Sequence, residues 1–137
     1  MIKSPKLKKP NPDGGCMDAL IEMAQAAGYK VEWVSMSRYT GLLLDDRILI
    51  NQHRSIMTQR VALAHELGHI HHGHDWRVNP HSRERDERQA NRFAAELLVD
   101  PVELMEAEML YESPGAVAAA LSLPESILDI WRASAKA

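Results

Sequence analysis

The residues whose types and spacing carry the clearest chemistry are two histidines and a glutamate in the pattern His-Glu-x-x-His, at His65, Glu66 and His69. In an α-helix, side chains four positions apart lie one above the other, so both imidazoles can bind one metal ion. Glu66 lies about 100° further round the helix, where its carboxylate can reach a water molecule beside that metal. The spacing predicts a hydrolytic zinc site in which Glu66 is the base.

The residues that flank this pattern predict the helix it needs. Between Ser55 and Ile70, apolar residues recur every three or four positions and no proline interrupts them. Ser55 is suited to cap the start of the helix, and Gly73 is suited to end it. We therefore expect one helix that carries both histidines.

The third ligand is expected from residues 82–99, because a catalytic zinc usually takes three protein ligands and leaves one position for water. This stretch predicts a second helix with an apolar stripe, and Glu87 lies at the edge of the stripe. Glu84 is the alternative, whereas Asp86 is rotated by about 100° from Glu87 and should point elsewhere. Asn91 follows one turn later, where its amide oxygen can accept the free ring N–H of a ligating histidine.

Two segments carry a resemblance to a known family. Residues 60–69 read Arg-Val-Ala-Leu-Ala-His-Glu-Leu-Gly-His, and residues 87–99 read Glu-Arg-Gln-Ala-Asn-Arg-Phe-Ala-Ala-Glu-Leu-Leu-Val, with Pro101 shortly after. Over about residues 16–111, the sequence resembles the ImmA/IrrE family of zinc metallopeptidases, found beside helix-turn-helix repressors in phages and mobile elements. Asp100 is an extra residue before the proline, and the chain is short for the family, which leaves little room for a regulatory domain.

The resemblance implies roles for residues at matching positions. The two histidines and the glutamate that opens the second motif bind zinc in the family, which corresponds to His65, His69 and Glu87, and the intervening Glu66 corresponds to the general base. It also implies a zincin-like fold, one zinc ion per chain, and a protein substrate, which we expect to be a helix-turn-helix repressor encoded nearby.

The rest of the chain predicts the elements that position these motifs. Residues 16–27 have helical spacing before Gly28, and three short strands follow, the last two joined by a tight turn at Asp45 and Asp46: residues 31–34, 42–44 and 47–50. We predict an α+β fold with a small three-stranded antiparallel sheet packed on the His-Glu-x-x-His helix and the second ligand-bearing helix. C-terminal helices complete it.

Several other residues are candidates for substrate contacts. The strand over residues 47–51 would hold an extended peptide if it lay at a sheet edge, with Asn51 and Gln52 near the cleft; an ordinary strand is the equal alternative. The transition-state oxyanion needs a further donor besides zinc, and the candidates are Tyr39, His81 and Tyr111.

The remaining histidines near the helix end form a local cluster of His71, His72, His74 and His81. A second metal is one interpretation, but neighbouring helical side chains point about 100° apart, and cations near a helix C-terminus are favourable in any case. We favour a solvated face. The alternation of arginine and glutamate over residues 83–92 likewise favours a solvent-facing helix surface.

The final segment, residues 114–134, has the spacing of two helices joined by a short turn, superficially a helix-turn-helix. DNA binding would need basic or amide side chains on the second helix, which instead carries Glu125 and Asp129. We therefore expect these helices to pack on the rest of the chain. Five apolar side chains are predicted to be buried: Leu121, Leu123, Ile127, Leu128 and Trp131.

Composition bounds the class of protein. With 137 residues and 45% hydrophobic content, one domain is expected, divided into a flexible basic arm (1–15), a metallopeptidase core (16–111) and a C-terminal helical extension (112–137). No apolar run reaches membrane-spanning length, no secretory signal is evident, and the single Cys16 cannot form an internal disulfide. A net charge of −3 gives no general attraction to nucleic acid. A cytoplasmic protein is expected.

The function predicted from these observations is a zinc-dependent endopeptidase that cleaves a protein substrate. The alternative is a zinc-containing binding module that sequesters a repressor or an antitoxin without cleaving it. The presence of Glu66 favours the enzyme. Direct nucleic-acid or membrane binding is not expected.

Overall fold

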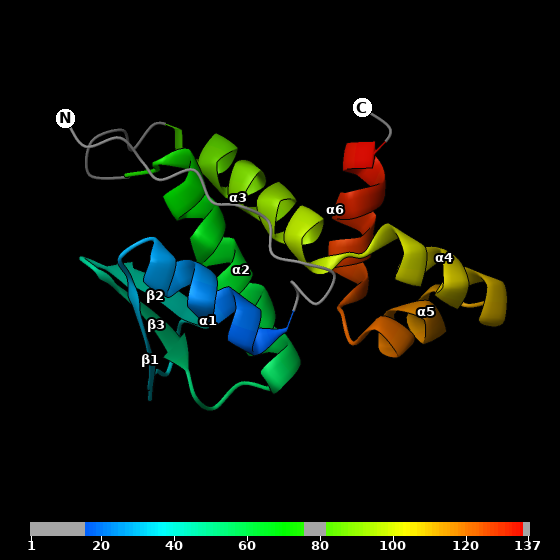
Figure 1. Ribbon diagram of the computed structural model, residues 1–137, viewed down its shortest axis with the longest axis horizontal. Coiled ribbons are helices and arrows are strands. Elements are labelled where there is room, and N and C mark those ends of the chain that lie inside the picture. The colour runs from blue at the N-terminus through cyan, green and yellow to red at the C-terminus, as the bar shows by residue number, and fades with distance from the viewer. Residues whose placement is uncertain (1–15, 76–81, 136–137) are drawn as a thin grey trace.

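The computed structural model describes residues 16–75 and 82–135. Figure 1 shows a small sheet on one side, two long helices through the middle, and shorter helices on the other side. The fold is α+β, as predicted. In chain order the elements are α1 (Met17–Ala26), β1 (Lys30–Val34), β2 (Gly41–Leu44), β3 (Arg47–Asn51), α2 (Ile56–His72), α3 (Arg83–Leu98), α4 (Pro101–Leu110), α5 (Pro114–Leu121) and α6 (Glu125–Ala135).

The sheet is mixed, so the prediction of a purely antiparallel sheet was wrong. The strand order is β1-β3-β2, with β2 antiparallel to β3 and β1 parallel to β3. The tight turn pairs β2 with β3 as expected, and Asp45 adopts the left-handed φ of 56° there. Strands β1 and β2 are therefore not neighbours, because β3 lies between them in the sheet. The most buried strand thereby gains a hydrogen-bonded neighbour on both sides.

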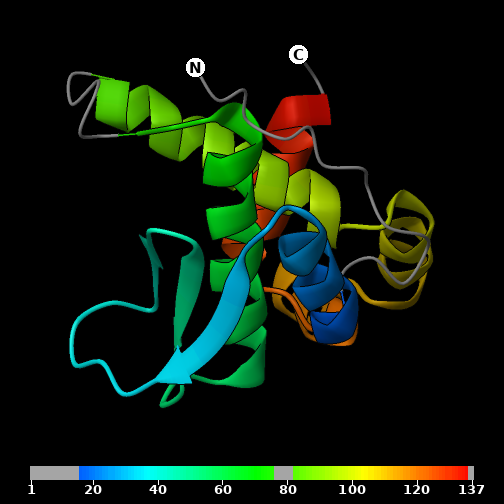
Figure 2. The ribbon, with the colours of Figure 1, turned by 60° about the vertical axis from the view of Figure 1, so that its left-hand side comes forward.

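Helix α2 begins and ends where the sequence predicts. Ser55 Oγ accepts a hydrogen bond from the Thr58 backbone N–H at 3.2 Å, and Gly73 ends the helix with a left-handed φ of 68°. In Figure 1, α2 lies between the sheet and α3, and it contacts both. Figure 2 shows α3 crossing α2. Gly68 permits the close approach of α3, because a Cβ there would lie 2.8 Å from the Ala90 backbone.

The C-terminal helices pack on α3 and on one another. Helix α6 contacts α3, and α5 contacts both α4 and α6. Of the five side chains expected in the core, Leu123, Ile127 and Leu128 are buried, while Leu121 and Trp131 are partly buried against it.

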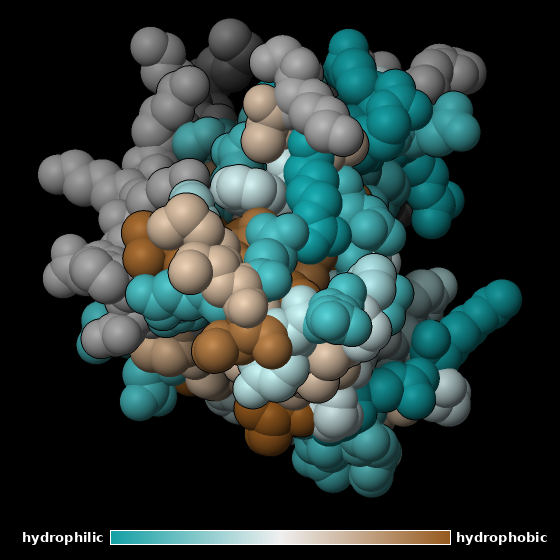
Figure 3. All heavy atoms as spheres, turned by 90° about the vertical axis from the view of Figure 1, so that its right-hand side faces the viewer, coloured by the Kyte–Doolittle hydropathy of each residue, from teal (hydrophilic) through white to brown (hydrophobic). Residues whose placement is uncertain are grey.

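Helix α4 is the most exposed of these elements. It buries Leu104 and Ala107, but leaves Met105, Met109 and Leu110 exposed. Figure 3 faces the side of the molecule that carries α4 and α5, where apolar and polar side chains are mixed. In the part of the chain that the structure describes, no helix combines the length and the apolar character that a membrane crossing requires.

Candidate metal centre

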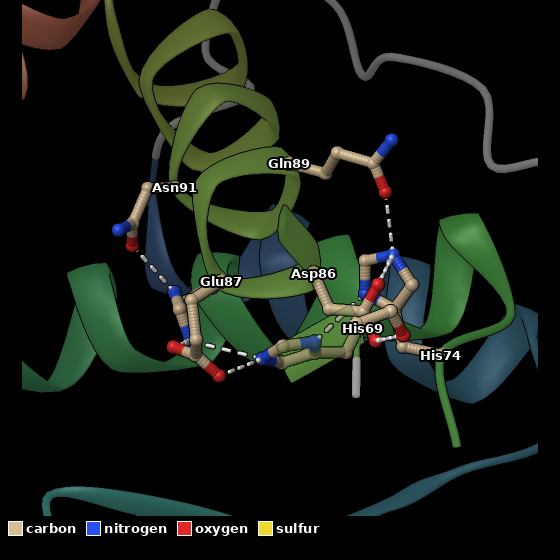
Figure 4. Close-up of polar contacts among 8 residues, drawn as sticks. His69, His74, Asp86, Glu87, Gln89 and Asn91 are labelled. Atoms are coloured by element: carbon tan, nitrogen blue, oxygen red, sulfur yellow. Dashed lines mark hydrogen bonds and ion pairs between the residues drawn. The ribbon is translucent and has the colours of Figure 1, made fainter. Parts of the chain in front are cut away.

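Three side chains from two helices converge on one point. The long α2 presents His65 and His69 on the same face, with their Nε2 atoms 3.1 Å apart. Glu87 from α3 reaches across, its Oε2 lying 3.0 Å from His65 Nε2 and its Oε1 lying 3.0 Å from His69 Nε2. The potential ligand atoms of all three residues lie within 4.8 Å of one another, and Figure 4 shows Glu87 facing His69.

The chemistry of this cluster fits a divalent cation. Two imidazole nitrogens that face each other at 3.1 Å repel unless a proton or a cation lies between their lone pairs. Burial, together with neighbouring His65, lowers the pKa of His69 to about 4, so this ring is neutral at pH 7 and offers a lone pair. Two nitrogens and one carboxylate are the type and number of protein ligands that catalytic zinc sites use.

The other ring nitrogen of each histidine also has a partner. His65 Nδ1 lies 2.7 Å from Asn91 Oδ1, where the sequence places a supporting amide, and His69 Nδ1 lies 3.0 Å from His74 Nδ1. Both contacts leave the Nε2 atoms directed at the cluster. The contact with His74 was missed by the sequence interpretation, which assigned that residue to a solvated face.

Glu66 lies beside the three clustered residues in a confined position. Only 8% of it is exposed, and burial, followed by the negative charge of Glu87, raises its pKa to about 7. Gly41 on β2 lies close to it: a Cβ there would be in ordinary contact with Glu66 Cγ at 3.5 Å, and in a tighter contact with Ala62 Cβ at 3.3 Å. The side chain of Glu66 is therefore enclosed on the face of α2 that is turned toward the sheet.

These four residues line one open cleft of about 910 Å³. One wall is formed by residues 39–43, which include most of β2, and another by the face of α2 that carries His65, Glu66 and His69. Arg83, at the start of α3, is a cationic side chain in the lining that sequence reasoning missed. The alternation of arginine and glutamate over residues 83–92 had assigned it to a solvent-facing helix surface.

The remaining candidates are placed differently. Tyr39 lines the cleft and is exposed. Asn51 is fully buried, and its amide N–H groups donate to the backbone oxygens of Met36 and Tyr39 at 2.8 and 2.9 Å, so it anchors a loop. Gln52 and Tyr111, although both exposed, are not part of the cleft lining found among the described residues.

His81 lies outside the described residues. Glu84 is exposed and is not in the metal-ligating cluster found in the described part of the chain, whereas Asp86 is buried and faces His74. Asp86 lies outside the metal-ligating cluster, as expected, but it is buried rather than part of the solvent-facing surface predicted for residues 83–92.

The hypothesis that residues 47–51 hold a peptide at a sheet edge is also corrected. This strand, β3, is central and is paired on both sides. Strand β2 lies at an edge of the sheet and also lines the cleft.

Comparison with known proteins agrees with this geometry. No curated protein and no solved structure matches the chain. The family model of the peptidase M78 group, described as the IrrE N-terminal-like domain, matches residues 22–130, which include the whole cluster and extend into α6. A metallopeptidase-type function goes with this family. The resemblance to ImmA/IrrE proteins is thereby confirmed, and the chain belongs to the peptidase M78, IrrE N-terminal-like family.

Proposed function

We propose that the protein is a zinc-dependent endopeptidase whose zinc is held by His65, His69 and Glu87 and whose base is Glu66. The observation that carries the proposal is the convergence of three ligand atoms within 4.8 Å, in the same open cleft as a confined carboxylate. Structural zinc sites are usually closed by a fourth protein ligand, whereas three ligands at an open cleft suit catalysis.

The residues divide the chemical work between them. When bound, zinc acts as a Lewis acid that polarises the scissile carbonyl and makes water a stronger acid. Glu66 accepts the proton of the attacking water and then delivers it to the leaving amine. Asn91 fixes the ring of His65 through its 2.7 Å contact. Tyr39 and Arg83 line the same cleft and are the candidates for donating a hydrogen bond to the oxyanion.

Strand β2 offers a way to hold the substrate. It pairs with β3 on one side, and it forms a wall of the cleft beside Glu66. An extended peptide can add to the edge of such a sheet through main-chain hydrogen bonds, which do not depend on particular side chains. A strand-like substrate across an open cleft continues past both sides of the cut, which supports an endopeptidase.

The proposed substrate is a helix-turn-helix repressor encoded nearby, and the proposed setting is the cytoplasm, which a single unpaired cysteine fits. The proposal does not include DNA binding by the protein itself. Arg132, a basic residue of α6, already faces carboxylates, at 3.5 Å from Glu108 and 3.9 Å from Asp129. These pairs support a role for α6 in packing.

The test is cleavage of the neighbouring gene product by the zinc-loaded protein, followed by mass spectrometry of the fragments. Wild type should create new termini, and Glu66→Gln should not. Glu84→Gln is the matched control, because Glu84 is an exposed glutamate outside the cluster, and it should cleave normally. Cleavage that persists in Glu66→Gln would contradict the mechanism. Tight binding by wild type without cleavage would replace the enzyme with the sequestering module.

A further inference from the structure

His74 lies outside the ligand set, yet it contacts His69 twice. We propose that His74, supported by Asp86 and Gln89, is a positioning residue that orients His69 and strengthens its hold on zinc. The inference rests on the proposed zinc site. It adds a relay of polar contacts that runs from Asp86 and Gln89 through His74 to His69. Figure 4 shows the ring of His74 between His69 and the side chains of α3.

The backbone explains why His74 lies there. Gly73 ends α2 in the left-handed conformation, with a φ of 68°, and this turns the chain back over the last turn of the helix. The backbone N–H of His74 then donates to the carbonyl oxygen of His69 at 3.0 Å. Backbone and ring of His74 are thus both held against the same residue, His69.

The hydrogen bonds assign the ring protons. If His69 offers Nε2 to zinc, its proton is on Nδ1, which donates to His74 Nδ1 at 3.0 Å. His74 Nδ1 must then be unprotonated, and its proton is on Nε2. That N–H donates to Gln89 Oε1 at 2.7 Å and lies 3.4 Å from Asp86 Oδ1. Both nitrogens of His74 are therefore occupied, which argues against a second metal there.

Asp86 gives the relay a buried negative charge. Its side chain is 9% exposed, and Ser82 Oγ donates to its Oδ2 at 3.1 Å. Within the described residues its Oδ1 makes no hydrogen bond of good geometry; His74 Nε2 at 3.4 Å and Arg85 Nη2 at 3.8 Å face it. A carboxylate beside Nε2–H makes the opposite nitrogen a stronger acceptor, which in turn makes His69 a stronger ligand.

Helix α3 therefore supports both ligating histidines from adjacent faces. Glu87 and Asn91, one turn apart, face the cluster and His65, whereas Asp86 and Gln89 face His74. Contacts of this kind commonly change metal affinity by about 10- to 100-fold when they are removed.

The experiment measures zinc affinity by competition with a chromophoric chelator. His74→Phe keeps a ring but removes the acceptor, and it should bind zinc about 10- to 100-fold more weakly than wild type. His74→Asn places an amide oxygen near the position of Nδ1, so it should recover part of the loss. His53→Phe is the matched control: His53 is exposed and contacts Ser35 at 2.8 Å, outside the cluster, and its replacement should leave the affinity unchanged.

A second readout separates positioning from general destabilisation. Melting temperatures are compared without metal and with added zinc, and the rise on adding zinc should be smaller in His74→Phe. Asp86→Asn, which keeps the shape and removes the charge, should also weaken zinc binding and serves if His74→Phe does not fold. Wild-type affinity in these variants would overturn the relay alone. A wild type that binds no zinc would overturn the metal site, and the proposed function with it.

Discussion

Replacing Glu66 with glutamine should stabilise the metal-free protein at neutral pH. Burial and the charge of Glu87 raise the pKa of Glu66 from 4.5 to about 7. Between these values the unfolded chain carries an ionised Glu66 while the folded protein keeps it protonated, so unfolding releases a proton. The stability contributed by this group is complete below pH 4.5 and is lost as the pH rises through 7.

The size of the effect follows from the interval between the two pKa values. Each pH unit across the interval lowers the free energy of unfolding by about 1.4 kcal/mol, which gives a total of about 3 kcal/mol. Glutamine has nearly the shape of the protonated carboxyl group but does not ionise, so Glu66→Gln avoids this loss. The low pKa of His69, about 4, acts in the opposite direction, but it is common to both proteins and cancels in the comparison.

The assay is urea unfolding of both proteins in a metal chelator, at a series of pH values from below 4.5 to above 7. The difference in free energy of unfolding, Glu66→Gln minus wild type, should rise by about 3 kcal/mol over this range. A difference that does not change with pH would refute the reasoning, because Glu66 would then titrate normally in the folded protein.

Three further predictions test the ligand set, the helix packing and the core. Glu87→Ala should lose most of its bound zinc in a metal analysis, whereas Glu84→Ala should keep it; the reverse result would exchange their roles. Gly68→Ala should lower the free energy of unfolding in urea by about 1–3 kcal/mol, because the new methyl group meets the backbone of α3. Leu128→Ala should cost about 2–5 kcal/mol in the same assay, whereas Met109→Ala, at a site 80% exposed, should change stability by less than about 0.5 kcal/mol. Equal costs would show that α6 does not contribute to the core.

Local signals in the sequence predicted the helix that carries the cluster. Spacing alone puts His65 and His69 on one face of a helix, and the caps at Ser55 and Gly73 depend on residue types beside the helix ends. Glu87 could also be predicted as the third ligand and Asn91 as the supporting amide. Their spacing of four residues places them on the same face once a helix is assumed.

Contacts between distant elements could not be predicted in this way. The parallel pairing of β1 depends on the path of the chain between strands, which no residue type specifies. The sequence does not distinguish a polar residue at a strand end that binds substrate from one that is buried and donates hydrogen bonds to a loop, as Asn51 does. His74 acquires its place from the turn at Gly73 and from the approach of α3, and both are properties of the folded chain.

The most direct test of the central claim is anomalous diffraction at the zinc absorption edge from crystals of the zinc-loaded protein. We expect one peak per chain at about 2.0–2.2 Å from His65 Nε2, His69 Nε2 and a Glu87 carboxylate oxygen. A peak at His71 and His72 instead, or no peak at these three ligands in fully loaded protein, would contradict the account.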